Sequence, residues 1–221
     1  MKKYWKIIVD VLMFLLFLYL MSYHAGRGLL LHALLGITLF VLFIIHHLLN
    51  LYWYRTLFRG EYGFRRILLT ASNILLLAAM LFMMLSAFML SGMVFSFSTI
   101  PVDFGWIEIH YFSTAWGFML MAFHLGLHLH SAFNKLEVKL KETSFEYVLW
   151  LLEVILFLAG AYGFVQSGLW SDMVLSAQSI TPMTPVVFYI VHIGIVTAVC
   201  LAAHWIILVL SRRRKKGAEI K

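Results

Sequence analysis

The segment that decides the fold runs from His110 to His128 and reads H-Y-F-S-T-A-W-G-F-M-L-M-A-F-H-L-G-L-H. Most of its residues are apolar, but it carries histidines at 110, 124 and 128. On an α-helix, at about 100° per residue, these three positions fall within a narrow arc. Because a helix rises ~1.5 Å per residue, His110 and His124 are expected roughly 21 Å apart along one stripe.

A second segment repeats this pattern near the start of the chain. It runs from His32 to Asn50 and reads H-A-L-L-G-I-T-L-F-V-L-F-I-I-H-H-L-L-N. His32, His46 and Asn50 share one helical face, and the two histidines are again 14 residues apart. The repetition indicates two helices that each present a histidine at two separate levels.

The composition is that of an integral membrane protein. Of the 221 residues, 63% are hydrophobic and 12% are charged, whereas soluble domains carry about 25% charged residues. The single cysteine, Cys200, lies in an apolar run. It excludes an internal disulfide and a C-x-x-C-H haem-attachment motif, and we interpret it as a small packing residue.

Apolar segments long enough to span a bilayer predict an all-α fold of six transmembrane helices. The apolar core of the first follows Lys2, Lys3 and Lys6, as in a signal peptide, but we expect it to be retained as a helix. The chain is expected to form one cytochrome-b-like bundle over residues 1–221, without a soluble domain. The predicted spans are 4–23, 29–54, 67–92, 108–131, 145–165 and 186–211.

Basic residues predict the orientation of these spans. Sixteen of the 17 lysines and arginines lie in the N-terminus, the 55–66 and 132–144 connections and the C-terminal tail, and only Arg27 lies opposite. By the positive-inside rule, both termini are cytoplasmic. The tail sequence R-R-R-K-K is therefore read as an orientation signal and a contact for anionic lipid, not as a nucleic-acid site. The opposite connections, 93–107 and 166–185, either pack at the interface or dock an extramembrane partner.

This topology sets the depth of the histidines. The spans 29–54 and 108–131 run in the same direction, so His32 and His110 lie near the outer surface and His46 and His124 near the inner one. Each level then offers two imidazoles across the bundle, one for each side of a planar iron porphyrin. The apolar surroundings would bury the macrocycle and tune its reduction potential.

Small residues on the stripes favour a flat ligand. Gly36, Thr114 and Gly117 would let a macrocycle approach the backbone. Zinc would instead need three or four ligands converging on one point. We therefore predict two non-covalent b-type haems, with iron ligands His32 and His110 at the outer level and His46 and His124 at the inner level.

The remaining histidines leave alternatives open. A histidine within a membrane helix also serves in hydrogen bonds between helices. His192 and His204 are 12 residues apart, about 120° around a helix, so they do not share a seam. They would orient a haem propionate, line a quinone pocket or replace an assigned ligand. The reserve ligand candidates are His47, His128, His192 and His204.

Two carboxylates, Asp10 and Glu153, lie within apolar spans. An ionisable group at membrane depth usually serves protons, ions or a buried partner. Both are predicted in the cytoplasmic half, where they would relay protons to a quinone beside the inner haem. Alternatively, each reaches the interface, pairs with a basic residue, or hydrogen-bonds a histidine such as His128 or His204.

Runs in several spans resemble the flavinylation-associated cytochrome family of prokaryotes. These are L-H-A-L-L-G…F-I-I-H-H-L-L-N-L-Y-W (31–53), L-S-G-M-V-F-S (90–96), I-H-Y-F…F-H-L-G-L-H (109–128) and A-Y-G-F (161–164). The resemblance implies a di-haem b-type cytochrome of the cytoplasmic membrane that passes electrons to extracytoplasmic flavin-bearing or other redox proteins. The paired motifs of the family map onto His32, Gly36, His46, Asn50, His110, His124 and His128. Thr114 stands where the first motif has Gly36, so the repeat is imperfect.

The sequence is consistent with three alternative functions. The first is an electron conduit between a quinone pool or cytoplasmic-side donor and an extracytoplasmic redox partner. The second is a quinone-reactive anchor subunit of a larger oxidoreductase. The third is a haem-free, histidine-rich membrane transporter. The sequence has no nucleotide, flavin or iron–sulfur motif, so any substrate chemistry needs partner proteins.

Overall fold

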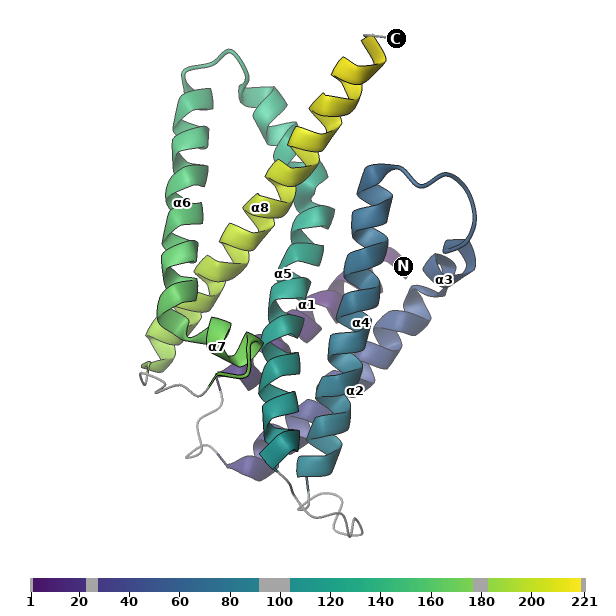
Figure 1. Ribbon diagram of the computed structural model, residues 1–221, viewed down its shortest axis with the longest axis vertical. Helices are drawn as coiled ribbons and strands as arrows, with labels where there is room; N and C mark the ends of the chain where they lie inside the picture. The colour runs from purple at the N-terminus through teal and green to yellow at the C-terminus, as the bar shows by residue number, and fades with distance from the viewer. Residues whose placement is uncertain (1, 23–27, 92–103, 177–182, 220–221) are drawn as a thin grey trace. The chain divides into compact units, whose positions relative to one another are not determined.

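A computed structural model describes residues 2–22, 28–91, 104–176 and 183–219, and helices dominate these ranges (Figure 1). The described residues contain no β-strand, as the all-α prediction requires. The helices are α1 (Lys2–Met21), α2 (Leu29–Leu49), α3 (Leu51–Thr56), α4 (Phe64–Leu90), α5 (Phe104–Leu140), α6 (Phe145–Ser167), α7 (Leu169–Met173) and α8 (Pro185–Glu219).

Five of these helices are long and apolar enough to cross a membrane, which indicates a multi-pass membrane protein. These candidate spans are Tyr4–Met21, Leu29–Leu49, Phe64–Leu90, Phe145–Ser167 and Pro185–Ser211. The remaining predicted span, 108–131, lies within α5, which is not among the five. Histidines are strongly polar, and those of α5 lower its mean hydropathy.

The predicted span 29–54 is interrupted at Asn50, between α2 and α3. The backbone N–H of Asn50 donates to the carbonyls of His46 and His47, and its side-chain Nδ2 also donates to the His46 carbonyl at 2.9 Å. An asparagine side chain that bonds the preceding turn competes with the helical hydrogen bonds. The expected single helix therefore ends here.

The chain divides into two compact units. Unit 1 comprises Met1–Glu61 and Ala79–Thr114, and unit 2 comprises Tyr62–Ala78 and Ala115–Lys221. Both α4 and α5 contribute to each unit. Within unit 1, α1 packs against α2.

Unit 2 is organised by close packing of α6 and α8. A Cβ added at Gly160 of α6 would overlap the Gly194 carbonyl of α8 and would lie 2.6 Å from the Ala198 Cβ. Small residues at such crossings let two helix backbones approach closely. Cys200 of α8 is buried, and its thiol donates to the Ala122 carbonyl of α5 at 3.3 Å. This agrees with its interpretation as a packing residue.

Candidate functional site

The structure brings together the two histidines predicted at the outer level. His32 lies in the first turns of α2 and His110 in the first turns of α5, and both belong to unit 1. Their ring centroids are 6.2 Å apart, with 71° between the ring planes. Two imidazoles from helices far apart in the sequence therefore lie close enough to address one metal ion from opposite sides.

A serine of α4 indicates which nitrogen of His110 carries the proton. The Ser86 hydroxyl donates its only hydrogen to the Met83 carbonyl at 2.9 Å. Its oxygen also lies 3.1 Å from His110 Nδ1, so in this contact the serine must accept and Nδ1 must donate. In the neutral imidazole this leaves the lone pair on Nε2, the nitrogen that would bind a metal.

The small residues beside this pair agree with a flat ligand. A Cβ added at Gly36, one turn beyond His32, would meet no other atom within 4 Å. The Thr114 hydroxyl oxygen, one turn beyond His110, is buried and has no hydrogen-bond partner within the described residues. Gly117 follows on α5 as a buried residue of unit 2. Open space beside one helix and an unsatisfied hydroxyl on the other leave the outer histidines compatible with a bound macrocycle.

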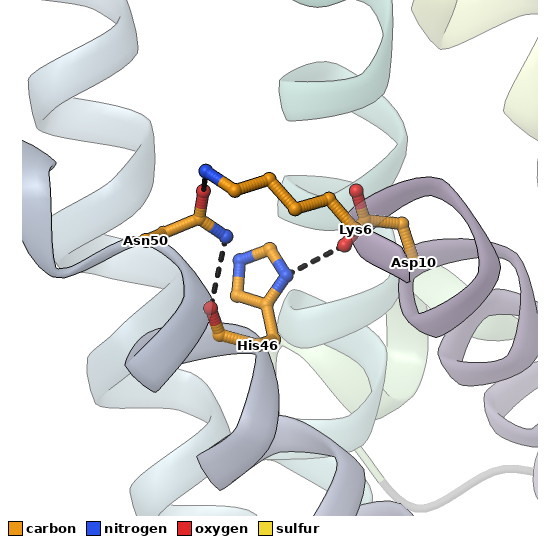
Figure 2. A network of polar contacts seen from close by, with 4 residues as sticks. All are labelled: Lys6, Asp10, His46 and Asn50. Carbon is orange, nitrogen blue, oxygen red and sulfur yellow. Dashed lines mark hydrogen bonds and ion pairs between the residues drawn. The ribbon is translucent and has the colours of Figure 1, made fainter. Parts of the chain in front are cut away.

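At the inner level, His46 makes a short bond to a carboxylate. Its Nδ1 lies 2.6 Å from Asp10 Oδ1 of α1 (Figure 2). A carboxylate oxygen accepts, so Nδ1 donates and Nε2 retains its lone pair, as in His110. Histidines that bind metals usually donate their other ring N–H to a carboxylate, carbonyl or water in this way. The alternative in which a membrane carboxylate accepts a hydrogen bond from a histidine therefore applies to Asp10, and the histidine is His46, not His128 or His204.

A second contact, one helical turn away, also joins α1 to the end of α2. Lys6 Nζ donates to Asn50 Oδ1 at 2.9 Å (Figure 2). Lys6 precedes Asp10 by four residues, and Asn50 follows His46 by four, so the two contacts form successive rungs between antiparallel helices. The start of α1 and the end of α2 thus lie at the same end of unit 1, as the predicted topology requires.

His47, a reserve candidate, has a different environment. Its Nδ1 lies 2.6 Å from the Tyr54 hydroxyl of α3, and its ring meets Phe43 edge-on at 4.3 Å between centroids. Its Nε2 atom is buried and has no hydrogen-bond partner within the described residues. His47 therefore stays an alternative to His46, and a substitution test must include both.

The other predicted inner ligand, His124, lies on α5 in unit 2, whereas His46 belongs to unit 1. The pairing of these two residues therefore stays a prediction. His124 is in ring contact with His128 one turn further along α5, with centroids 4.5 Å apart. These two imidazoles are thus neighbours, and His128 remains a reserve ligand.

On α8, the two reserve histidines are held by hydrogen bonds. His204 is fully buried, and its Nε2 donates to Glu137 Oε1 at 2.8 Å. Its Nδ1 lies 2.9 Å from His130 Nδ1, so both of its nitrogens are engaged. His192 Nδ1 donates to the Phe188 carbonyl at 2.9 Å. Interhelical and backbone hydrogen bonding, the alternative left open for these histidines, is what this geometry favours.

The second membrane carboxylate, Glu153 of α6, is buried and accepts a hydrogen bond from the Trp205 indole of α8 at 3.2 Å. It also interacts electrostatically with Glu137 and His204. Sequence reasoning missed Glu137, because residues 132–144 were assigned to a connection, whereas α5 continues to Leu140. A cluster of ionisable side chains (His130, Glu137, Glu153 and His204) therefore lies within unit 2.

Neither a family model, nor a curated protein, nor a solved structure matches this chain. The donor set must therefore be judged by its own chemistry. Among the described residues, no group of three or more histidine, cysteine or acidic side chains converges as a metal site. An iron porphyrin needs only two axial ligands from the protein, because the macrocycle supplies the other four nitrogens. The two imidazoles of His32 and His110 are therefore sufficient in number to serve as the protein ligands of such a cofactor.

Proposed function

We propose that this chain is a membrane b-type cytochrome that holds two haems and carries electrons across the bilayer. The observation that carries the proposal is the geometry of His32 and His110. A metal–imidazole bond of about 2 Å, with the ring centre ~1 Å beyond the nitrogen, places two axial imidazole centroids about 6 Å apart. The measured separation is 6.2 Å, and His110 is held in the tautomer that presents Nε2.

The proposed topology has six spans, with α5 as the additional one, and both termini in the cytoplasm. The distribution of basic residues supports this orientation. Packing within unit 1 also agrees: α1 and α2 are antiparallel, and the first turns of α2 and α5 meet at His32 and His110. The compartment we propose is a prokaryotic cytoplasmic membrane, as the family resemblance implies.

Bound haem would supply a one-electron carrier at each level, and the protein would supply its axial ligands and an apolar environment. The outer haem would be held by His32 and His110, and the inner haem by His46 and His124. We propose a quinone pool or a cytoplasmic-side protein as donor and an extracytoplasmic flavin-bearing or other redox protein as acceptor. The basic tail would contact anionic lipid.

The decisive experiment is a haem assay on the purified full-length chain. We expect two haems per chain in a pyridine haemochrome assay, both extracted by acid acetone, and a b-type reduced-minus-oxidised spectrum. A fully loaded preparation with one haem would contradict the two-site proposal. A preparation that binds none would instead favour the haem-free transporter.

Histidine variants test the ligand assignment. His32→Ala and His110→Ala should each remove the same haem, and His46→Ala and His124→Ala should remove the other. His47→Ala is the matched control, because it is the neighbour of His46 and has its own partner, Tyr54. Loss of a haem in the His47 variant, with both retained in the His46 variant, would reverse that assignment.

The second candidate function, a quinone-reactive subunit, is supported by the ionisable cluster of unit 2. Quinone reduction takes up protons, and the cluster links buried Glu153 and His204 to Glu137 and His130. Glu153→Gln and Glu137→Gln should slow quinol-driven haem reduction, while both haems are retained. Unchanged rates and pH dependence in both variants would leave the chain as an electron conduit between proteins.

A further inference from the structure

The two histidine levels of unit 1 differ in the group that accepts the Nδ1 proton. At His46 the acceptor is the Asp10 carboxylate, at 2.6 Å. At His110 it is the Ser86 hydroxyl, at 3.1 Å. The first bond is short and charge-assisted, whereas the second is longer and joins two neutral groups, so the first is the stronger.

This difference changes the imidazole as a ligand. An imidazole that shares its Nδ1 proton with a carboxylate becomes a more basic donor through Nε2. A more basic axial ligand, with a negative charge behind it, stabilises ferric iron over ferrous iron, because the ferric ion carries the higher positive charge. Hydrogen bonding of this kind around the axial ligand is one of the ways in which a protein lowers a haem potential.

We propose that Asp10 sets the reduction potential of the haem held by His46 below that of the haem held by His32 and His110, so that electrons pass downhill from the first to the second. This inference rests on the proposed function, since it needs both haems. Asp10 is a positioning residue: it acts through His46 and does not touch the iron.

The surroundings of Asp10 support this role. The rung from Lys6 to Asn50 fixes the register of α1 on α2, which keeps Asp10 opposite His46 (Figure 2). Lys6 lies one turn before Asp10 on α1. Because its ammonium donates to Asn50, Lys6 does not take the place of His46 as the partner of Asp10.

The proposal assigns a direction to the electron transfer. In the topology given above, His46 lies toward the cytoplasm and His32 and His110 toward the outside. A lower potential at His46 makes outward transfer favourable and inward transfer unfavourable. This direction fits an extracytoplasmic acceptor.

The experiment is a spectroscopic redox titration of the purified full-length chain and its Asp10→Asn variant, each with its haem content measured. We expect two one-electron transitions in the unchanged protein. The variant should raise only the lower one, by at least a tenfold change in the equilibrium constant, or about 59 mV. Asp10→Glu should restore most of the shift. Glu61→Gln, which removes one carboxylate from the α3–α4 connection, should move neither transition.

Further variants assign each redox transition to one haem and keep the experiment decisive if Asp10→Asn loses haem. His46→Ala should abolish the lower transition, and His32→Ala the upper one. If Asp10→Asn loses haem, Asp10→Ser provides a neutral hydroxyl acceptor like the one at His110, and its remaining lower transition should shift upward. Loss of the inner haem in every Asp10 variant, including Asp10→Glu with its retained carboxylate, would overturn the proposal in favour of a purely structural role.

Two other outcomes would also overturn it. One is an unchanged lower transition in Asp10→Asn with both haems present, and the other is loss of the upper transition in His46→Ala. Failure of the proposed function would look different, because the unchanged protein itself would then bind no haem.

Discussion

At the residue scale, the histidine stripes were predictable because a helical period places equally spaced residues at matching depths. The groups that hold those histidines were not predictable. Ser86 is 24 residues from His110, and Asp10 is 36 residues from His46. Nothing in local periodicity indicates which side chains of separate helices will meet. Sequence reasoning could therefore propose which histidines bind a metal, but not which side chains hydrogen-bond them.

Ser86 provides a test of the outer site. In Ser86→Ala, His110 Nδ1 loses its acceptor and the ring loses its fixed orientation, which at metal sites typically costs about 10–100-fold in affinity. We expect weaker haem binding at the outer site, measured by haemin titration of the haem-free protein. Ser72→Ala is the matched control, because Ser72 is also buried on α4 and also donates to a carbonyl three residues earlier. Equal losses in both variants would show a general effect of α4 serines.

At the element scale, hydropathy located the helices well. Within the described residues, each predicted span is helical over most of its length, although 29–54 is divided between α2 and α3. This is expected because burial in lipid requires a continuous apolar segment with its backbone hydrogen bonds closed. The end of α2 at Asn50 and the extension of α5 to Leu140 were missed. The first depends on a side chain that bonds its own helix, and the second on a charged helical segment that hydropathy assigns to a connection.

The α6–α8 crossing predicts that alanine substitution destabilises the protein much more at one glycine of α6 than at another. Gly160→Ala places a methyl group on the Gly194 carbonyl, so the helices must separate, and overpacking of this kind costs about 1–3 kcal/mol. Gly163→Ala is the control, because its nearest contact, Val191 Cγ1, would lie at an ordinary 3.4 Å. We expect Gly160→Ala to lower the midpoint of thermal unfolding in detergent and Gly163→Ala to leave it nearly unchanged. Similar midpoints for the two variants would contradict this packing.

Asp172 of α7, outside the candidate spans, should make the folding stability depend on pH. Burial raises its pKa above the ordinary value of 3.8, so the folded state holds the proton more tightly than the unfolded state. Stability from this group is therefore complete below that value and is lost as the pH rises through the raised pKa. Asp172→Asn should be more stable than the unchanged protein at neutral pH, and the gain should vanish under acid conditions. Thermal unfolding followed from pH 3 upward, with equal gains at every pH, would refute this.

At the scale of the whole molecule, an electron conduit requires two levels of histidine, one near each end of the spans. The outer pair is brought together within unit 1, whereas His46 and His124 belong to different units and their pairing rests on the sequence repeat. Depth and direction are predictions from the charge distribution, and the structure tests neither the pairing of His46 with His124 nor a cofactor at that level. This is why a function that includes both levels needs a test on the intact protein.

Transfer of electrons across a sealed membrane is that test. With the chain in liposomes that enclose a reductant and with a membrane-impermeant ferricyanide acceptor outside, we expect oxidation of the enclosed reductant well above the rate of protein-free vesicles. His32→Ala and His46→Ala should each abolish the excess, because either change breaks a pathway that runs through both levels in series, whereas His47→Ala should retain it. A dye-leakage control excludes damaged vesicles. Full transfer by the His32 variant would show that electrons do not pass through the outer site, and the chain would then serve one membrane face only.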